Sequence, residues 1–247
     1  STDGYMCSPH GTYRALAIFV NIIYDQTPAD TIKKYTTQAT TYWKPDTTFS
    51  FNMYPPAYFT DIFDSHVSDV YKGSLSRLYS ESSFGQLNLL CDLMVVNIRQ
   101  SQITQKNPGS NFTLFNLMDA VAEQINANGG VTTIYGYNNI NEYDRSSFAG
   151  LSADIPDGKM DMIHFVLRNT FITKTGLNFG STNSGSGYSG EGVYPRIPLK
   201  LGNSYHGYNL GSYQCVGGWN INTSVKTICS HEIAHYFLGG NEFHTSG

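Results

Sequence analysis

The sequence has few charged residues and lacks any cluster of positive ones. Lys and Arg together number 15 and Asp and Glu 19 among 247 residues, so the net charge is −4 and the charged fraction 14%. Proteins that track a nucleic-acid backbone neutralise its phosphates with clustered Lys and Arg. The composition therefore argues against nucleic acid as a partner.

The chain also lacks an apolar run long enough to span a bilayer, which takes about 20 residues in a helix. The stretch RALAIFVNII at residues 14–23 is far shorter. No signal peptide begins at Ser1, which leaves two interpretations: a secreted chain whose signal has been removed, and a cytosolic chain. A composition dominated by Tyr, Thr, Ser, Asn and Gly favours the secreted, extracellular interpretation.

Cysteine is scarce, and no two cysteines have the spacing of a metal knuckle. The four lie at positions 7, 91, 215 and 229. Four thiols allow three pairings, and spacing does not choose among them. Two interpretations stay open. One is a disulfide between Cys215 and Cys229, which flank a Gly-Gly-Trp turn, and the other is a set of four buried thiols.

The remaining patterns predict one domain of mixed element order, either α+β or three-layer. A chain of this length can bury a sizeable core. β-Branched and aromatic runs predict strands, and apolar residues at helical spacing predict helices. We expect strands over residues 14–24, 85–98 (as a strand or a hairpin) and 159–167, helices over 30–43, 68–83 and 111–130, and a Gly/Ser-rich loop over 180–190.

The motif HEIAH near the end of the chain carries the strongest chemical signal. His231 and His235 are four residues apart, so in a helix both imidazoles lie on one face and can bind one Zn²⁺ at about 2.0–2.1 Å. Glu232 lies about 100° around the helix from His231, where it can take a proton from a zinc-bound water. We therefore predict His231 and His235 as zinc ligands and Glu232 as the general base.

Short motifs arise by chance, so a pair of core histidines is the alternative interpretation. A catalytic zinc expects three protein ligands and a water. In the metzincin pattern HExxHxxGxxH the third histidine falls at the position of Asn241 here. We predict His244 as the third ligand, after a loop three residues longer; Glu242, or a residue elsewhere or beyond the chain end, is the alternative.

Two weaker signals lie earlier in the chain. Asp154, Asp157 and Asp161 surround Gly158 and supply oxygen ligands of the kind Ca²⁺ prefers, although a solvated turn before a strand is the favoured interpretation. Residues 185–201 form a segment that can act as an edge strand and pair with an extended peptide substrate.

Four segments, in order, resemble secreted zinc peptidases of the immune inhibitor A type. RALAIFVNI is similar to the first strand of that family. YKGSLSRLYSESSFGQLNL at residues 71–89 resembles its Gly-Ser-led helix with an aromatic pair, and DGKMDMIHFVLRN at 157–169 resembles its Asp-Gly-x-x-Asp strand. HEIAH follows last, as in the family, although the family places its third ligand at the position of Asn241.

The resemblance implies a zincin-like metallopeptidase domain over residues 1–247, with a twisted mixed β-sheet and an active-site helix beneath the cleft. It implies a secreted zinc endopeptidase that hydrolyses peptide bonds of extracellular proteins. Metzincin-type zincins continue past the third ligand to a Met-containing turn, so we expect a further C-terminal subdomain outside these residues. The alternative function is a non-catalytic binding or adhesin module on a zincin scaffold; the intact Glu232 argues against it.

Overall fold

The computed structural model describes the central part of the chain and its C-terminal helical segment. The described residues are 10–26, 64, 66, 74–106, 114–133, 140–145, 155–156, 158–167, 186–190, 197–202, 204–208, 213–217, 229–231, 233–234 and 237. The helix predicted over residues 30–43 lies outside them. Among the described residues, no helix combines the length and the apolar content that crossing a bilayer requires.

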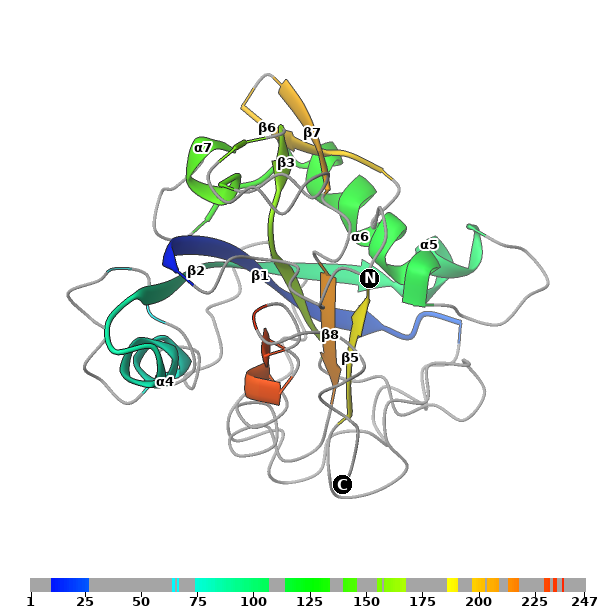
Figure 1. Cartoon of the computed structure of the whole chain (residues 1–247). Coiled ribbons are helices and arrows are strands. Elements are labelled where there is room, and N and C mark those ends of the chain that lie inside the picture. Colours follow the sequence, from blue (N-terminus) through cyan, green and yellow to red (C-terminus); the bar gives the residue numbers. More distant parts are fainter. Residues whose placement is uncertain are drawn as a thin grey trace, which may run out of the picture.

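A five-stranded mixed sheet forms the centre of the molecule (Figure 1). Its strand order is β2-β1-β4-β8-β5. The first four strands are parallel, and β5 at the edge runs antiparallel to β8. The bounds are β1 Gly11–Ile23, β2 Leu87–Arg99, β4 Ile163–Leu167, β5 Ser186–Gly190 and β8 Tyr213–Gly217.

The two long strands, β1 and β2, are buried along most of their length. Strands covered on both faces read as nearly continuous apolar runs, which both of them do. Their alternate side chains face opposite sides of the sheet. Leu16, Ile18 and Val20 belong to one buried cluster, whereas Ala17 and Phe19 belong to the other. The predicted strand over 14–24 is confirmed, and residues 87–99 form a single strand, so the hairpin alternative is wrong.

One face of the sheet is covered by three helices and a small second sheet (Figure 1). The helices are α5 Gln100–Thr104, α6 Leu114–Ala127 and α7 Ile140–Tyr143, and the small sheet has the order β3-β7-β6, with β3 Lys159–Met160, β7 Ser204–Tyr208 and β6 Leu199–Leu201. Helix α6 confirms the helix predicted over 111–130 from Leu114 onward. Gly129 and Gly130 follow it at φ values of 99° and 96°, which favour glycine.

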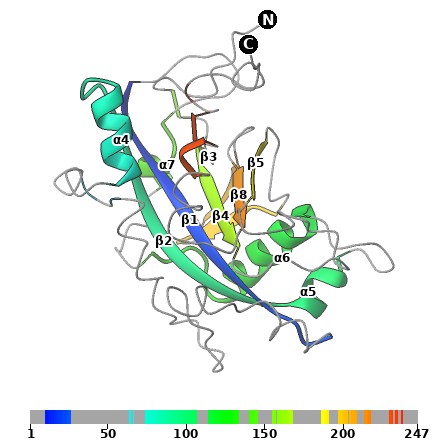
Figure 2. The ribbon, with the colours of Figure 1, turned by 90° about the horizontal axis from the view of Figure 1, so that it is seen from below.

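The opposite face is covered by α4, Leu75–Ser82, and by the helical residues of 229–237 (Figure 2). Ser74 caps α4 by accepting a hydrogen bond from the backbone amide of Arg77 at 3.1 Å. This helix confirms the C-terminal part of the helix predicted over 68–83. Among the described residues, the sheet therefore lies between two layers of helices and strands. Nothing in this arrangement is specific to a zincin-like fold, which stays a prediction.

Two predicted elements differ in part from the structure. The loop predicted over 180–190 is wrong at residues 186–190, which form the edge strand β5 and pair with β8 in the register Tyr188↔Cys215. This strand agrees with the start of the segment interpreted as an edge strand over 185–201. The stretch 159–167, predicted as one strand, is divided between β3 and β4, which belong to different sheets. At the division, the backbone amide of Asp161 donates to the carbonyl of Tyr143 at 2.8 Å, which draws the chain out of the strand.

Candidate active site

The candidate site is built on the helical segment that contains HEIAH. Residues 229–231, 233, 234 and 237 are helical. Cys229, Ile233 and Phe237 are at most 1% exposed and lie in one buried cluster with side chains of β1, β2 and β4. Their four-residue spacing places them on one helix face. That face is therefore the one that packs on the central sheet.

His231 lies on the other side of this helix. At 100° per residue it is about 160° around the axis from the centre of the sheet-facing group. Its side chain is half-buried, in contrast to the fully buried Ile233 two residues later. The structure therefore argues against His231 as a residue of the sheet-facing core, which was the alternative to its role as a metal ligand.

Side chains from α4 and β1 hold this helix against the sheet. The Tyr79 hydroxyl donates a hydrogen bond to the Ser230 carbonyl at 2.6 Å. The Tyr79 ring lies 5.8 Å from that of Phe237, and the Tyr13 ring contacts Phe237 edge-on at 5.5 Å. Tyr13 and Tyr79 are both buried. The peptide unit just before His231 is thus tied to another element of the fold.

The structure describes only one of the four predicted site residues. Glu232, His235 and His244 lie outside the described residues, as does the alternative third ligand Glu242. Within the described part of the chain, no three His, Cys, Asp or Glu side chains gather as metal ligands. The zinc site therefore stays a prediction that the position of His231 supports.

The candidate calcium residues are represented only by Asp161. Asp154 and Asp157 lie outside the described residues. Asp161 is buried, and its carboxylate accepts a hydrogen bond from the backbone amide of Arg145 at 2.7 Å. Asp161 therefore lies in a bend just before β4, as expected, but it is not solvated there, because its carboxylate accepts a hydrogen bond inside the protein.

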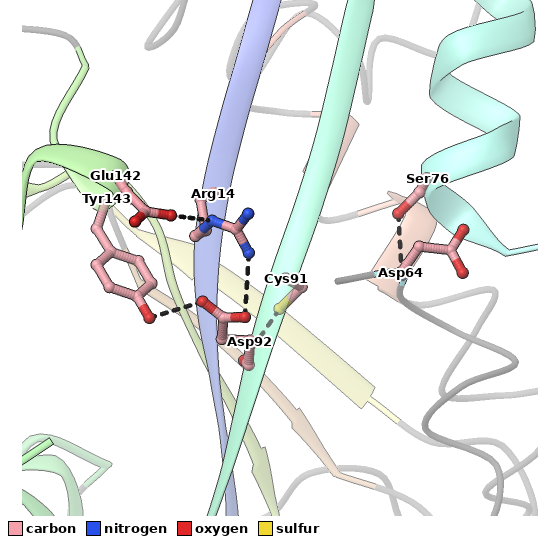
Figure 3. A network of polar contacts seen from close by, with 7 residues as sticks. All are labelled: Arg14, Asp64, Ser76, Cys91, Asp92, Glu142 and Tyr143. Carbon is pink, nitrogen blue, oxygen red and sulfur yellow. Dashed lines mark hydrogen bonds and ion pairs between the residues drawn. The ribbon is translucent and has the colours of Figure 1, made fainter. Parts of the chain in front are cut away.

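A buried polar network that was not predicted from the sequence lies on the face of the sheet that α7 covers (Figure 3). Asp92 on β2 forms an ion pair with Arg14 on β1 at 3.1 Å and accepts a hydrogen bond from the Tyr143 hydroxyl at 2.7 Å. Glu142 also pairs with Arg14, at 3.1 Å. Burial raises the pKa of Asp92 to about 6, opposed by the Tyr143 hydrogen bond and the Arg14 charge.

Carboxylates with a shifted pKa often mark active sites. This network is therefore a second candidate for the active site. A pocket of about 350 Å³ lies beside it, lined by Thr12, Arg14, Asn141, Glu142, Asp144, Arg145 and Pro156. Asp92 itself is 0% exposed and is absent from that lining, so a substrate in the pocket does not reach it. The network is therefore a structural link between β1, β2 and α7. Its signal in the sequence is a charged residue in or beside each apolar stretch, Asp92 in LLCDLMVV of β2 and Arg14 before ALAIFV of β1.

Two of the four cysteines are described with their side chains. Cys91 on β2 and Cys229 at the start of the candidate helix are buried thiols in the same cluster. Burial raises the pKa of Cys91 well above that of an ordinary thiol, so this thiol stays protonated at neutral pH. Cys7 and the side chain of Cys215 lie outside the described residues.

Comparison with known proteins adds no second source for the function. No protein-family model matches the chain, and no curated protein matches its sequence. The functional assignment therefore depends on the chemistry of HEIAH and on the surroundings of its helix.

Proposed function

We propose that this protein is a secreted zinc-dependent endopeptidase of the immune inhibitor A type. The observation that carries the proposal is the orientation of the helix around HEIAH. Cys229, Ile233 and Phe237 bury one face against the sheet, and His231 lies on the opposite side. A helix that continues in this way places His235 one turn later, also about 160° from the sheet-facing group.

The donor set suits zinc. Two imidazoles at helical spacing and a third from His244 leave one position open for water, which is the ligand count of a catalytic site. When bound there, zinc supplies a Lewis acid for the peptide carbonyl and makes the bound water more acidic. Glu232 would serve as the general base towards the attacking water and then as the general acid towards the departing amine.

The edge of the sheet supports a peptide as the substrate. Among the described residues, β5 is the outermost strand on the side of β8, and it runs antiparallel to its neighbour. An extended peptide can pair with an exposed edge strand through backbone hydrogen bonds. This mode of binding accepts many sequences, which suits an endopeptidase that acts on extracellular proteins.

The experiment that tests the proposal compares the parent with Glu232→Gln and His244→Ala. The parent is expected to bind one zinc per chain and to cleave an unfolded protein substrate such as casein. Glu232→Gln should retain zinc but lose about 10²–10⁴-fold in kcat/KM, the usual contribution of a general base. His244→Ala should release zinc to a chelator far more readily than the parent.

His66→Ala provides the matched control, because His66 is an exposed histidine remote in sequence from HEIAH. Its zinc content and activity should equal those of the parent. Zinc binding without any peptide cleavage would instead favour the non-catalytic binding module. A Glu232→Gln variant as active as the parent would remove the proposed mechanism.

A further inference from the structure

Tyr79 contacts the candidate helix at the residue that precedes the first predicted ligand. Its hydroxyl donates to the Ser230 carbonyl at 2.6 Å, across 151 residues of sequence. The Ser230 carbonyl belongs to the same peptide unit as the backbone nitrogen of His231. A bond to this oxygen therefore restrains the plane from which the His231 side chain projects.

The surroundings of Tyr79 restrain the hydrogen bond between its hydroxyl and the Ser230 carbonyl. The Tyr79 side chain is 9% exposed, and its ring also packs on Phe237. Burial raises the pKa of Tyr79, so the phenol keeps its proton and stays a donor. In a helix the Ser230 carbonyl also accepts from the amide four residues later, and a carbonyl has two lone pairs, so both bonds are compatible.

Helix α4, which carries Tyr79, is itself fixed at its start. The Ser74 hydroxyl donates to the Asp64 carboxylate, and the backbone amide of Asp64 donates to the Ser76 hydroxyl at 3.1 Å (Figure 3 shows the Asp64–Ser76 contact). The carbonyl of Asp64 in turn accepts from the amide of Cys91 on β2 at 2.8 Å. Tyr79 therefore extends from an element that is anchored to the central sheet.

We infer that Tyr79 is a positioning residue, whose hydroxyl orients His231 for metal binding from outside the ligand set. The inference rests on the proposed zinc site and adds a residue that HExxH does not contain. Groups that orient a ligand are worth about 10–100-fold in metal affinity. Tyr79 acts one step further out, through the backbone, so the expected effect is at the lower end of that range.

The test compares Tyr79→Phe with Tyr143→Phe. Each removes one buried tyrosine hydroxyl that donates a hydrogen bond, but Tyr143 donates to Asp92 on the other face of the sheet. Zinc affinity, measured by competition with a chelator, should fall about 10-fold in Tyr79→Phe. It should stay within about twofold of the parent in Tyr143→Phe. A zinc affinity of Tyr79→Phe within twofold of the parent would overturn the inference.

A second readout separates this inference from the proposed function. Amide hydrogen exchange of residues 231–235, measured without metal, should be faster in Tyr79→Phe than in the parent and unchanged in Tyr143→Phe. If the parent binds no zinc, the proposed function fails, and this exchange measurement alone decides whether Tyr79 orders the turn around His231. Equal exchange in Tyr79→Phe and the parent would then reject the role of Tyr79.

The parent protein offers a check that needs no variant. A buried phenol hydrogen-bonded at 2.6 Å should give a slowly exchanging hydroxyl proton by NMR. This proton should show a nuclear Overhauser effect to protons of Ser230 or His231. Its absence would overturn the inference even if Tyr79→Phe did not fold.

Discussion

At the scale of single residues, the carboxylate of Asp92 is a group that is costly to bury. It is 0% exposed and compensated by Arg14 and Tyr143, yet its pKa still rises from 3.8 to about 6. Burial thus outweighs the favourable contacts, which is common when an ion pair is removed from water. The fold is therefore expected to hold Asp92 more easily in its protonated form.

This pKa predicts a pH dependence of stability with a definite sign. Because the folded-state pKa is the higher one, the contribution of Asp92 is fully present below about pH 4 and is lost as pH rises through about 6. A shift from 3.8 to about 6 corresponds to about 3 kcal/mol. Asp92→Asn, which keeps an oxygen for the Tyr143 hydroxyl, should remove this loss.

The measurement is the free energy of unfolding by urea at pH 4 and at pH 7 in the parent and in Asp92→Asn. The difference between the two pH values should change by about 2 kcal/mol between the proteins, since the unfolded carboxyl is already partly ionised at pH 4. Comparing the proteins cancels the titration of the other carboxyl groups. Parallel pH profiles would show that Asp92 is ionised equally easily in the folded and unfolded chains.

At the scale of elements, α4 ends in a turn with one residue in the left-handed conformation, a position that glycine usually occupies. The Gly85 amide donates to the Ser80 carbonyl at 2.7 Å and the Phe84 amide donates to Glu81 at 3.1 Å, the two bonds of a Schellman motif. The residue in the left-handed position is Phe84, with φ of 55°, and its side chain is 93% exposed. The Cβ of Phe84 therefore adds backbone strain to the turn, and the ring buries almost no apolar area in return.

Phe84→Gly is expected to stabilise the protein by about 1 kcal/mol, because glycine adopts this conformation without the clash of a Cβ. Gly85→Ala is the matched opposite. Gly85 has φ of 79° and open space around an added Cβ, so this substitution should cost about 1 kcal/mol through backbone strain alone. Thermal and urea unfolding measure both effects. A destabilised Phe84→Gly variant would mean that the Phe84 ring makes a contact in solution.

At the scale of the whole molecule, the candidate site joins parts of the chain that are distant in sequence. The helix of HEIAH packs on β1, β2 and β4 and is tied to α4 by Tyr79. A ligand that binds only the folded arrangement stabilises all of it. Zinc is therefore expected to raise the stability of the entire domain.

Removal of zinc should lower the midpoint of thermal unfolding. At a zinc concentration of about 1,000 times Kd, binding contributes about 4 kcal/mol, which corresponds to roughly 10 °C in a domain of this size. Calorimetry with and without a chelator measures the shift. His244→Ala should show a much smaller shift and His66→Ala an undiminished one; a full shift in His244→Ala would assign the third ligand to another residue.

The sequence alone predicts an element correctly where the residues of that element contain its apolar periodicity and its end signals. The strand at 14–24 and the helix ending before Gly129 follow from apolar periodicity and from end signals within a few residues. For strand β5 the sequence left a loop and an edge strand both open, because Gly is depleted in strands, and its pairing with β8 decides for the strand. The division of 159–167 likewise depends on Asp161 bonding to Tyr143, which no local pattern encodes.

The same division holds for the candidate site. HEIAH is a local motif, since the periodicity of a helix alone brings two histidines to one face and a glutamate beside them. Which face meets the sheet was decided by the burial of Cys229, Ile233 and Phe237 against distant strands. The Tyr79–Ser230 bond and the Asp92 network also join residues far apart in sequence, so only the packed chain brings these partners within hydrogen-bonding distance.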